Sequence, residues 1–238
     1  MYNISAFAVC FNHKGDVMAS SVKRLRFACY TSNISMSVVS TLSPLLFLTF
    51  REQYGVSYSL LGLLVLINFV TQLTIDLIFS FFSHKFNIAK TVKFTPLLTS
   101  IGLILYALAP VIFPQNIYLG LAVGTVVFSV SGGLSEVLIS PVIAAIPSEN
   151  PEREMSKLHS MYAWGVVGVV ILSTLFLLFF GSINWMYLAL LWSIVPLTAF
   201  LIFLTLFTVT RSRYSGPSSC ESISQTLIGK PQWFVSLP

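Results

Sequence analysis

Charged residues are scarce in this chain of 238 residues: Asp, Glu, Lys and Arg together make up 9% of it, whereas 55% is hydrophobic. A soluble domain of ordinary composition carries about 25% charged residues. Such a shortage cannot cover a water-facing surface, so most of the exterior must face lipid. The formal net charge of +5 does not indicate a nucleic-acid binder, because the basic residues form short clusters between apolar runs rather than one basic face.

Residues that bind metals or catalyse reactions are equally rare. The chain has three cysteines without metal-ligand spacing, and three histidines that fall in different segments. It lacks the nucleophile elbow of hydrolases, the phosphate-binding P-loop and the zinc-protease motif. We therefore expect no enzyme, no metal site, no disulfide framework and no cofactor. The residues concerned are Cys10, Cys29, Cys220, His13, His84 and His159.

Six apolar segments are each long enough to cross a membrane, for which a helix needs about 20 apolar residues. Strands are a poor alternative, because the segments lack the alternating polarity of a barrel wall. Turn residues such as Gly55, Asn116 and Gly181 separate them. The sequence therefore predicts an all-α membrane protein of six transmembrane helices. The predicted spans are Phe27–Phe50, Ser57–Phe82, Phe94–Phe113, Ile117–Ile146, Lys157–Phe180 and Asn184–Val209.

Lysine and arginine indicate how these spans are oriented. With six spans both termini lie on one side, and that side holds every basic residue except Arg51. Because cytoplasmic loops are enriched in Lys and Arg, both termini are expected in the cytoplasm of a cell-membrane protein. Losing one span would scramble this pattern, which supports the count of six. The basic residues of the cytoplasmic side are Lys14, Lys23, Arg24, Arg26, Lys85, Lys90, Lys93, Arg153, Lys157, Arg211, Arg213 and Lys230.

A faint internal repeat links the first and fourth spans. Ser43-Pro44 and Ser140-Pro141 both lie between apolar residues, and the offset from Pro44 to Pro141 is 97 residues. The same offset brings the start of the second span near that of the fifth. Three spans per repeat reverse the topology, so the pattern favours a three-plus-three inverted repeat.

The two ends of the chain differ from its centre. We expect residues 1–22 to be an irregular cytoplasmic segment, with Met18 rather than Met1 as the true start. Residues 23–210 form the predicted six-helix bundle. Residues 211–225 are polar and Ser-rich, as in a cytoplasmic linker. Residues 226–238 turn apolar and aromatic again, which indicates the truncated start of a seventh helix.

Glu136 is the first ionisable candidate, because charge inside a membrane is costly and marks functional sites. It lies near the middle of the fourth span, and no Lys or Arg of this chain lies at similar depth. A carboxyl that exchanges a proton there could couple transport to a proton gradient. The alternative is a neutral glutamic acid that only hydrogen-bonds a neighbouring helix.

Asp76 is the second candidate, and it belongs to a polar stripe on the second span. Asn68, Gln72, Asp76, Ser80 and His84 recur at every fourth residue and so share one helix face. Such a face must meet protein or a water-filled cavity. We expect proton coupling by Asp76 or, equally, a packing hydrogen bond, and solute binding by Asn68 and Gln72.

Further solute-binding candidates lie on the first and fifth spans. Asn33 shares a face of the first span with Ser37, Ser40 and Thr41. On the fifth span, His159 is either a solute ligand or an interfacial histidine, and Trp164 either stacks on a solute or packs.

Several strings of the sequence resemble the major facilitator superfamily, and within it the fucose-permease-like branch and its bacterial relatives. They are Leu42–Phe47, Gly62–Leu73, Ser135–Pro141 and Leu158–Gly165. The resemblance implies the N-terminal six-helix half of a twelve-helix transporter, with Glu136 matching a fourth-span carboxylate of that branch.

Two departures from the family pattern qualify what the resemblance implies. The loop after the second span usually reads G-x-x-x-D-R-x-G-R-R, and here it is degenerate. The first span lacks the carboxylate typical of the branch, which argues against fucose itself. The loop positions that correspond to the motif are His84, Lys85, Asn87 and Lys90.

The sequence therefore predicts a secondary active transporter, half or truncated, for a small polar solute such as a sugar, with proton symport as the coupling. A second half or self-association would complete it. The alternatives are a proton-driven exporter of amphipathic drugs and a non-transporting membrane partner or broken-gene product.

Overall fold

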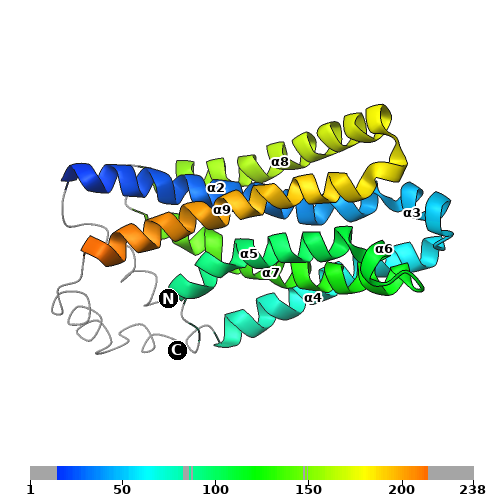
Figure 1. The fold of residues 1–238 in the computed structure, drawn as a ribbon. Helices are drawn as coiled ribbons and strands as arrows, with labels where there is room; N and C mark the ends of the chain where they lie inside the picture. Colours follow the sequence, from blue (N-terminus) through cyan, green and yellow to red (C-terminus); the bar gives the residue numbers. More distant parts are fainter. Residues whose placement is uncertain (1–14, 83–85, 87, 147, 149, 214–238) are drawn as a thin grey trace.

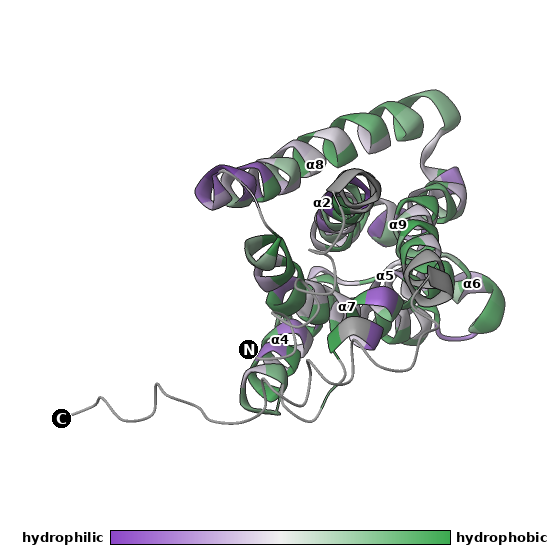
Figure 2. Cartoon of the chain, turned by 90° about the vertical axis from the view of Figure 1, so that its left-hand side faces the viewer, coloured by the Kyte–Doolittle hydropathy of each residue, from purple (hydrophilic) through white to green (hydrophobic). Residues whose placement is uncertain are grey.

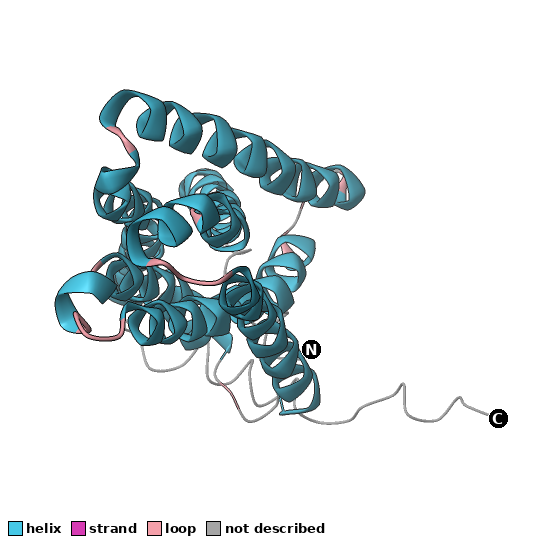
Figure 3. Cartoon of the chain, turned by 90° about the vertical axis from the view of Figure 1, so that its right-hand side faces the viewer, coloured by secondary structure: helices cyan, strands magenta, loops and turns pink. Residues whose placement is uncertain are grey.

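The computed structural model describes residues 15–82, 86, 88–146, 148 and 150–213. Every regular element among them is a helix (Figure 3), and the long helices run lengthwise beside one another (Figure 1). In chain order the elements are α2 (Gly15–Leu45), α3 (Phe47–Tyr54), α4 (Tyr58–Phe82), α5 (Ile88–Ala107), α6 (Ala109–Ile112), α7 (Ile117–Ala145), α8 (Pro151–Phe180), the 3-10 turn η2 (Ser182–Asn184) and α9 (Trp185–Arg213).

Each predicted span corresponds to one helix or to one bent pair of helices. Helices α4, α7 and α8 and the segment Ser182–Leu206 are each long and apolar enough to cross a membrane. Helices α2 and α3 form a fifth candidate with a 42° bend. The bend follows Pro44, which lacks a backbone N–H and crowds the preceding turn. Helix α5, continued by α6, packs along α7 and α9 and completes the six-helix bundle.

The helices extend further toward the basic end than the apolar pattern predicts. Helix α2 begins at Gly15, so the expected irregular segment is wrong for residues 15–22. Helix α8 begins at Pro151 rather than Lys157, because the Asn150 side chain caps it by accepting a hydrogen bond from the Arg153 amide at 3.1 Å. Helix α9 continues to Arg213, into the expected linker. Residues 1–14 and 214–238, and with them the predicted seventh helix, lie outside the described residues.

Helix packing shows the inverted repeat directly. Helix α2 packs against α8 and α9, and α7 packs in the same way against α4 and α5. Equivalent helices of the two repeats also contact each other: α2 packs against α7, and α5 packs against α9. A second proline pair, Pro96 in α5 and Pro196 in α9, occupies corresponding helices. The predicted three-plus-three architecture is therefore confirmed.

A polar layer separates two apolar clusters along the bundle. One cluster surrounds Trp185, whose ring meets Phe50 edge-on with 4.9 Å between centroids. The other lies toward the basic end and includes Leu158 and Phe203. Outward-facing residues are mainly apolar, whereas hydrophilic residues gather at the start of α8 (Figure 2). A lipid-facing bundle has this distribution.

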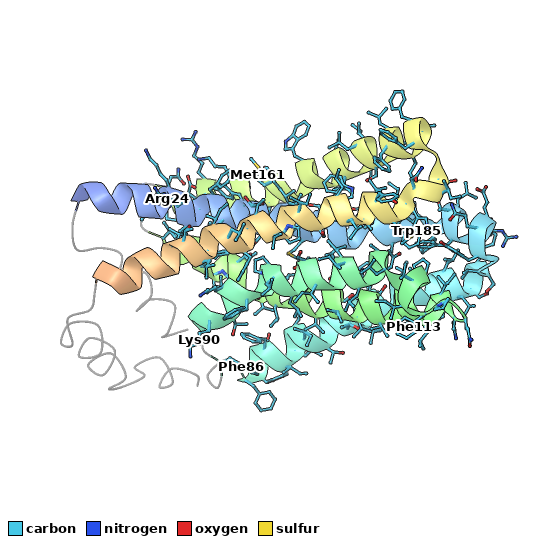
Figure 4. The ribbon with its side chains drawn as sticks, in the orientation of Figure 1. Arg24, Phe86, Lys90, Phe113, Met161 and Trp185 are labelled. Atoms are coloured by element: carbon cyan, nitrogen blue, oxygen red, sulfur yellow. The ribbon has the colours of Figure 1, made fainter. Side chains whose placement is uncertain are left out.

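Arg24 and Lys90 show which end of the bundle is basic, whereas Arg51 on α3 lies apart from them. Arg24 and Lys90 are both found at the end opposite Trp185 and Phe113 (Figure 4). At the same end Glu154 joins α8 to α2: it accepts a hydrogen bond from the Tyr30 hydroxyl at 2.7 Å and lies 3.7 Å from Arg26. Lys157 also donates to Glu154, at 2.9 Å. This polar cluster fixes the two helices where they leave the apolar region.

Candidate functional site

A cavity of about 350 Å³ opens between four of the six spans, α2, α4, α7 and α8. Helices α2 and α4 belong to the first repeat, and α7 and α8 belong to the second, so the cavity lies between the two repeats. Its walls combine hydroxyl, amide, imidazole and carboxyl groups with a few apolar side chains. The lining residues are Asn33, Met36, Val39, Ser40, Phe69, Gln72, Gly132, Ser135, Glu136, Ile139, Ser140, Leu158, His159 and Tyr162.

Hydrogen bonds to backbone carbonyls fix the wall formed by α2 and α8. The Asn33 amide donates to the Leu158 carbonyl at 2.6 Å, and one turn further along both helices Ser37 donates to the Tyr162 carbonyl at 2.8 Å. The Ser40 and Tyr162 hydroxyls then lie 3.1 Å apart at the cavity surface. Since Asn33 and Ser37 bond to backbone oxygens, this wall is held rigidly and presents paired hydroxyl groups.

The predicted stripe on α4 faces α7, but its members take different roles. Gln72 lines the cavity, whereas Asn68 is buried behind Gln72. The side-chain nitrogen of Gln72 donates a hydrogen bond to Oδ1 of Asn68 at 2.7 Å. Asp76 lies one turn beyond Gln72, where its Oδ1 is 3.0 Å from the position a Cβ on Gly133 would occupy. That oxygen is buried and has no hydrogen-bond partner among the described residues.

Glu136 contributes a carboxyl to the cavity from α7, between Ser135 and Ser140. Its side chain is exposed to the cavity rather than enclosed by other helices. No lysine or arginine is among the lining residues. Glu136 is therefore a carboxyl that no lysine or arginine of the lining opposes.

The structure brings four of the predicted solute and proton residues to this cavity: Asn33, Gln72, Glu136 and His159. Asn68 and Asp76 lie on the same side of α4 without being lining residues. Lys90 lies exposed near the start of α5, away from the cavity. The remaining loop positions, His84, Lys85 and Asn87, are outside the described residues.

Trp164 is not among the residues that line this cavity, so its predicted stacking on a solute stays a prediction. Its side chain is 71% exposed. A helix turns by about 100° per residue, so Trp164 lies roughly 200° around α8 from the lining residue Tyr162. Hydropathy alone could not orient the helix, since both faces of α8 carry aromatic residues.

The cavity also contains residues that the sequence prediction did not select for binding: Met36, Phe69, Ser135 and Ser140. Ser40 and Tyr162 line it as well: Ser40 shares a helix face with Asn33, and Tyr162 lies three residues after His159 and shares its face. Ser135 and Ser140 gave no such signal, because serine also occurs at helix contacts in membranes.

Water access to the cavity can be tested with single cysteines on α8. In a background with Cys10, Cys29 and Cys220 replaced by serine, a His159→Cys variant is expected to react readily with a membrane-impermeant thiol reagent. A Trp164→Cys variant is expected to react at least about tenfold more slowly, because a thiol facing lipid cannot ionise to the reactive thiolate. Equal labelling rates at the two positions would contradict this assignment of the faces of α8.

The fold and site together define a multi-pass helical membrane protein with a polar cavity between four of its six spans. The model of the Major Facilitator Superfamily matches residues 28–236. The chain belongs to this superfamily, whose members are transporters rather than enzymes.

One solved structure shows the same fold at low sequence identity. It is the xylose transporter XylE from E. coli in an inward-open conformation, with a TM-score of 0.66 and 12% identity. The alignment covers 87% of this chain and 55% of XylE, so the chain spans about half the length of that transporter. A search among curated proteins finds no match.

Proposed function

We propose that the chain is the N-terminal half of a secondary active transporter for a small polar solute such as a sugar, driven by protons. The observation that carries this proposal is the cavity between α2, α4, α7 and α8, with a carboxyl and paired hydroxyls on its walls. The similarity to a transporter that is named for xylose supports a neutral, hydroxyl-rich solute.

Alternating access would come from this half moving against a second one, either a C-terminal half or a second copy of the chain. The α2–α8 wall is tied by hydrogen bonds to backbone oxygens, so it moves as a unit. The other face of the cavity is open to a partner. We propose cytoplasmic termini in a cell membrane, because Arg24 and Lys90 lie at the same end of the bundle and every basic residue of the sequence except Arg51 is predicted on that side.

Proton coupling is assigned to Glu136, with Asp76 as a second carboxyl. Gly133 brings α7 against Asp76, and Glu136 follows Gly133 by three residues on the same side of α7. Two carboxyls on the facing sides of adjacent helices are costly to ionise together in a membrane. Protonation of one therefore favours ionisation of the other, which suits a site that must load and release protons.

A second candidate function is export of lipophilic cations. Phe69, with a side chain that is 60% exposed, and Met36 line the same cavity as the carboxyl of Glu136, and no lysine or arginine of the lining opposes a cation there. A non-transporting membrane partner is a further alternative, and it predicts no solute binding at all.

A ligand screen distinguishes these functions. We expect D-xylose and related neutral monosaccharides to raise the thermal unfolding temperature of the purified chain in lipid nanodiscs. A Tyr162→Phe variant should lose much of the shift, because it loses a hydroxyl from the cavity wall. Trp164→Ala is the matched control and should keep the shift, because Trp164 is on the same helix but not among the lining residues. A shift with tetraphenylphosphonium alone would support the exporter, and no shift with any ligand would contradict both transport functions.

A further inference from the structure

A buried chain of hydrogen bonds controls the orientation of Gln72 at the cavity wall. The Gln72 side-chain nitrogen donates to Oδ1 of Asn68 at 2.7 Å. The hydroxyl of Ser129 on α7 donates to the same oxygen at 2.6 Å. Asn68 and Ser129 are both buried, with 4% and 0% of their surface exposed. The Asn68 oxygen thus uses both of its lone pairs in a dry position between α4 and α7.

This arrangement sets which end of the Gln72 amide faces the solute. The nitrogen end is directed to Asn68 and packs over Gly132, where a Cβ would lie 3.2 Å from Nε2. The carbonyl oxygen is the other end of the planar amide, and it accepts no hydrogen bond among the described residues. Because Gln72 lines the cavity, this oxygen is the end offered to a solute.

Glu136 lines the same cavity as Gln72. It follows Gly132 by four residues and therefore lies on the same face of α7, one turn along. We propose that Asn68 and Ser129 are positioning residues that fix Gln72 as a hydrogen-bond acceptor beside Glu136. The α4–α7 wall then presents two acceptors and selects solutes with adjacent donors, such as the neighbouring hydroxyls of a sugar. This inference rests on the proposed function and specifies how its site recognises the solute.

An alternative set of hydrogen bonds among Ser129, Asn68 and Gln72 makes the opposite prediction. Ser129 also lies 2.5 Å from the carbonyl of Thr125, and its single proton serves one acceptor at a time. If that proton went to Thr125, Asn68 could turn its nitrogen toward Ser129 and toward Gln72. Gln72 would then have to accept from Asn68 and would present its NH₂ group to the cavity. The two arrangements offer opposite hydrogen-bonding groups to the solute, so one measurement separates them.

The measurement is side-chain amide NMR of the full chain in lipid nanodiscs, labelled with ¹⁵N-glutamine. The chain has five glutamines, and Gln72→Leu identifies the signal of Gln72 by its loss. One Gln72 amide proton is expected to exchange with water about tenfold more slowly than its partner, because it is bonded to buried Asn68. Two rapidly exchanging protons on this nitrogen would overturn the proposal.

Variants of the buried residues test the positioning role. Asn68→Leu, of similar size, should remove the slow exchange, and Ser129→Ala should speed it, since Asn68 then lacks its second donor. Thr74→Val is the matched control, because the Thr74 hydroxyl bonds only within α4. Unchanged exchange in a folded Asn68→Leu or Ser129→Ala chain would contradict the proposal. Because the readout needs no solute, it can succeed even where the monosaccharide screen fails, which would contradict the proposed solute class alone.

Discussion

Replacement of Glu136 by glutamine is expected to abolish proton-driven accumulation of solute while leaving solute exchange intact. Glutamine keeps the size and hydrogen bonding of a protonated glutamic acid but cannot release a proton. In a membrane interior the charged carboxyl costs at least a few kcal/mol. Protonation therefore biases which way the cavity opens, and a permanently neutral side chain removes that bias. Solute would still bind and cross, but only down its own gradient.

The assay requires this half together with a second half in proteoliposomes, and a solute identified by the screen. Accumulation is measured under an imposed proton gradient, and exchange is measured with labelled and unlabelled solute on opposite sides. Glu152→Gln is the matched control, because Glu152 lies exposed in the first turn of α8, away from the cavity. Wild-type accumulation by Glu136→Gln would exclude Glu136 from coupling. Loss of both exchange and accumulation in a folded protein would assign Glu136 to solute binding instead.

The number and approximate positions of the helices could be predicted from the sequence because apolar length is a local property. Lipid requires each span to satisfy its own backbone, so a long apolar run has few alternatives to a helix. Helix starts were less predictable, since helices continue beyond the apolar core wherever a cap supports them. The predicted fifth span begins at Lys157, whereas in the structure Asn150 caps α8 and Pro151 begins it.

The site was only partly predictable, and the reason is geometric. A stripe such as Asn68, Gln72 and Asp76 identifies a polar face but not which member reaches the cavity. That depends on the neighbouring helix: Ser129 of α7 holds Asn68, and Gly132 makes room for Gln72. Likewise, Ser37 looks like any membrane serine until its partner, a backbone oxygen of α8, is known.

Close approach between helices could also be predicted only in part from the sequence. Gly120 and Gly124 on α7 are four residues apart, a spacing that lets helices approach closely, and a Cβ on Gly124 would lie 2.7 Å from the Tyr106 backbone. The partner glycine on α5 gave no periodic signal. A Cβ on Gly102 would lie 2.5 Å from the backbone nitrogen of Phe128. Helix α5 therefore contacts α7 through glycines on both sides of one interface.

Gly102→Ala is consequently expected to destabilise the bundle by about 1–2 kcal/mol. A methyl group there meets the Phe128 backbone, which cannot move aside as a flexible side chain would, and overpacking costs about 1–3 kcal/mol. The gain in helix propensity from glycine to alanine, up to about 1 kcal/mol, offsets part of this loss. Gly62→Ala on α4 is the matched control, because no atom lies within 4 Å of its Cβ position.

The measurement can use a reporter already present in the chain. Cys29 is buried, so with Cys10 and Cys220 replaced by serine a thiol-reactive dye becomes fluorescent only when the bundle opens. The unfolding temperature should fall in Gly102→Ala and stay unchanged or rise in Gly62→Ala. Because α5 lies between α7 and α9, a loosened α5–α7 contact should weaken the join between the two repeats. A Gly102→Ala chain as stable as the Gly62→Ala control would show that the helices separate at little cost, and that glycine does not set their distance.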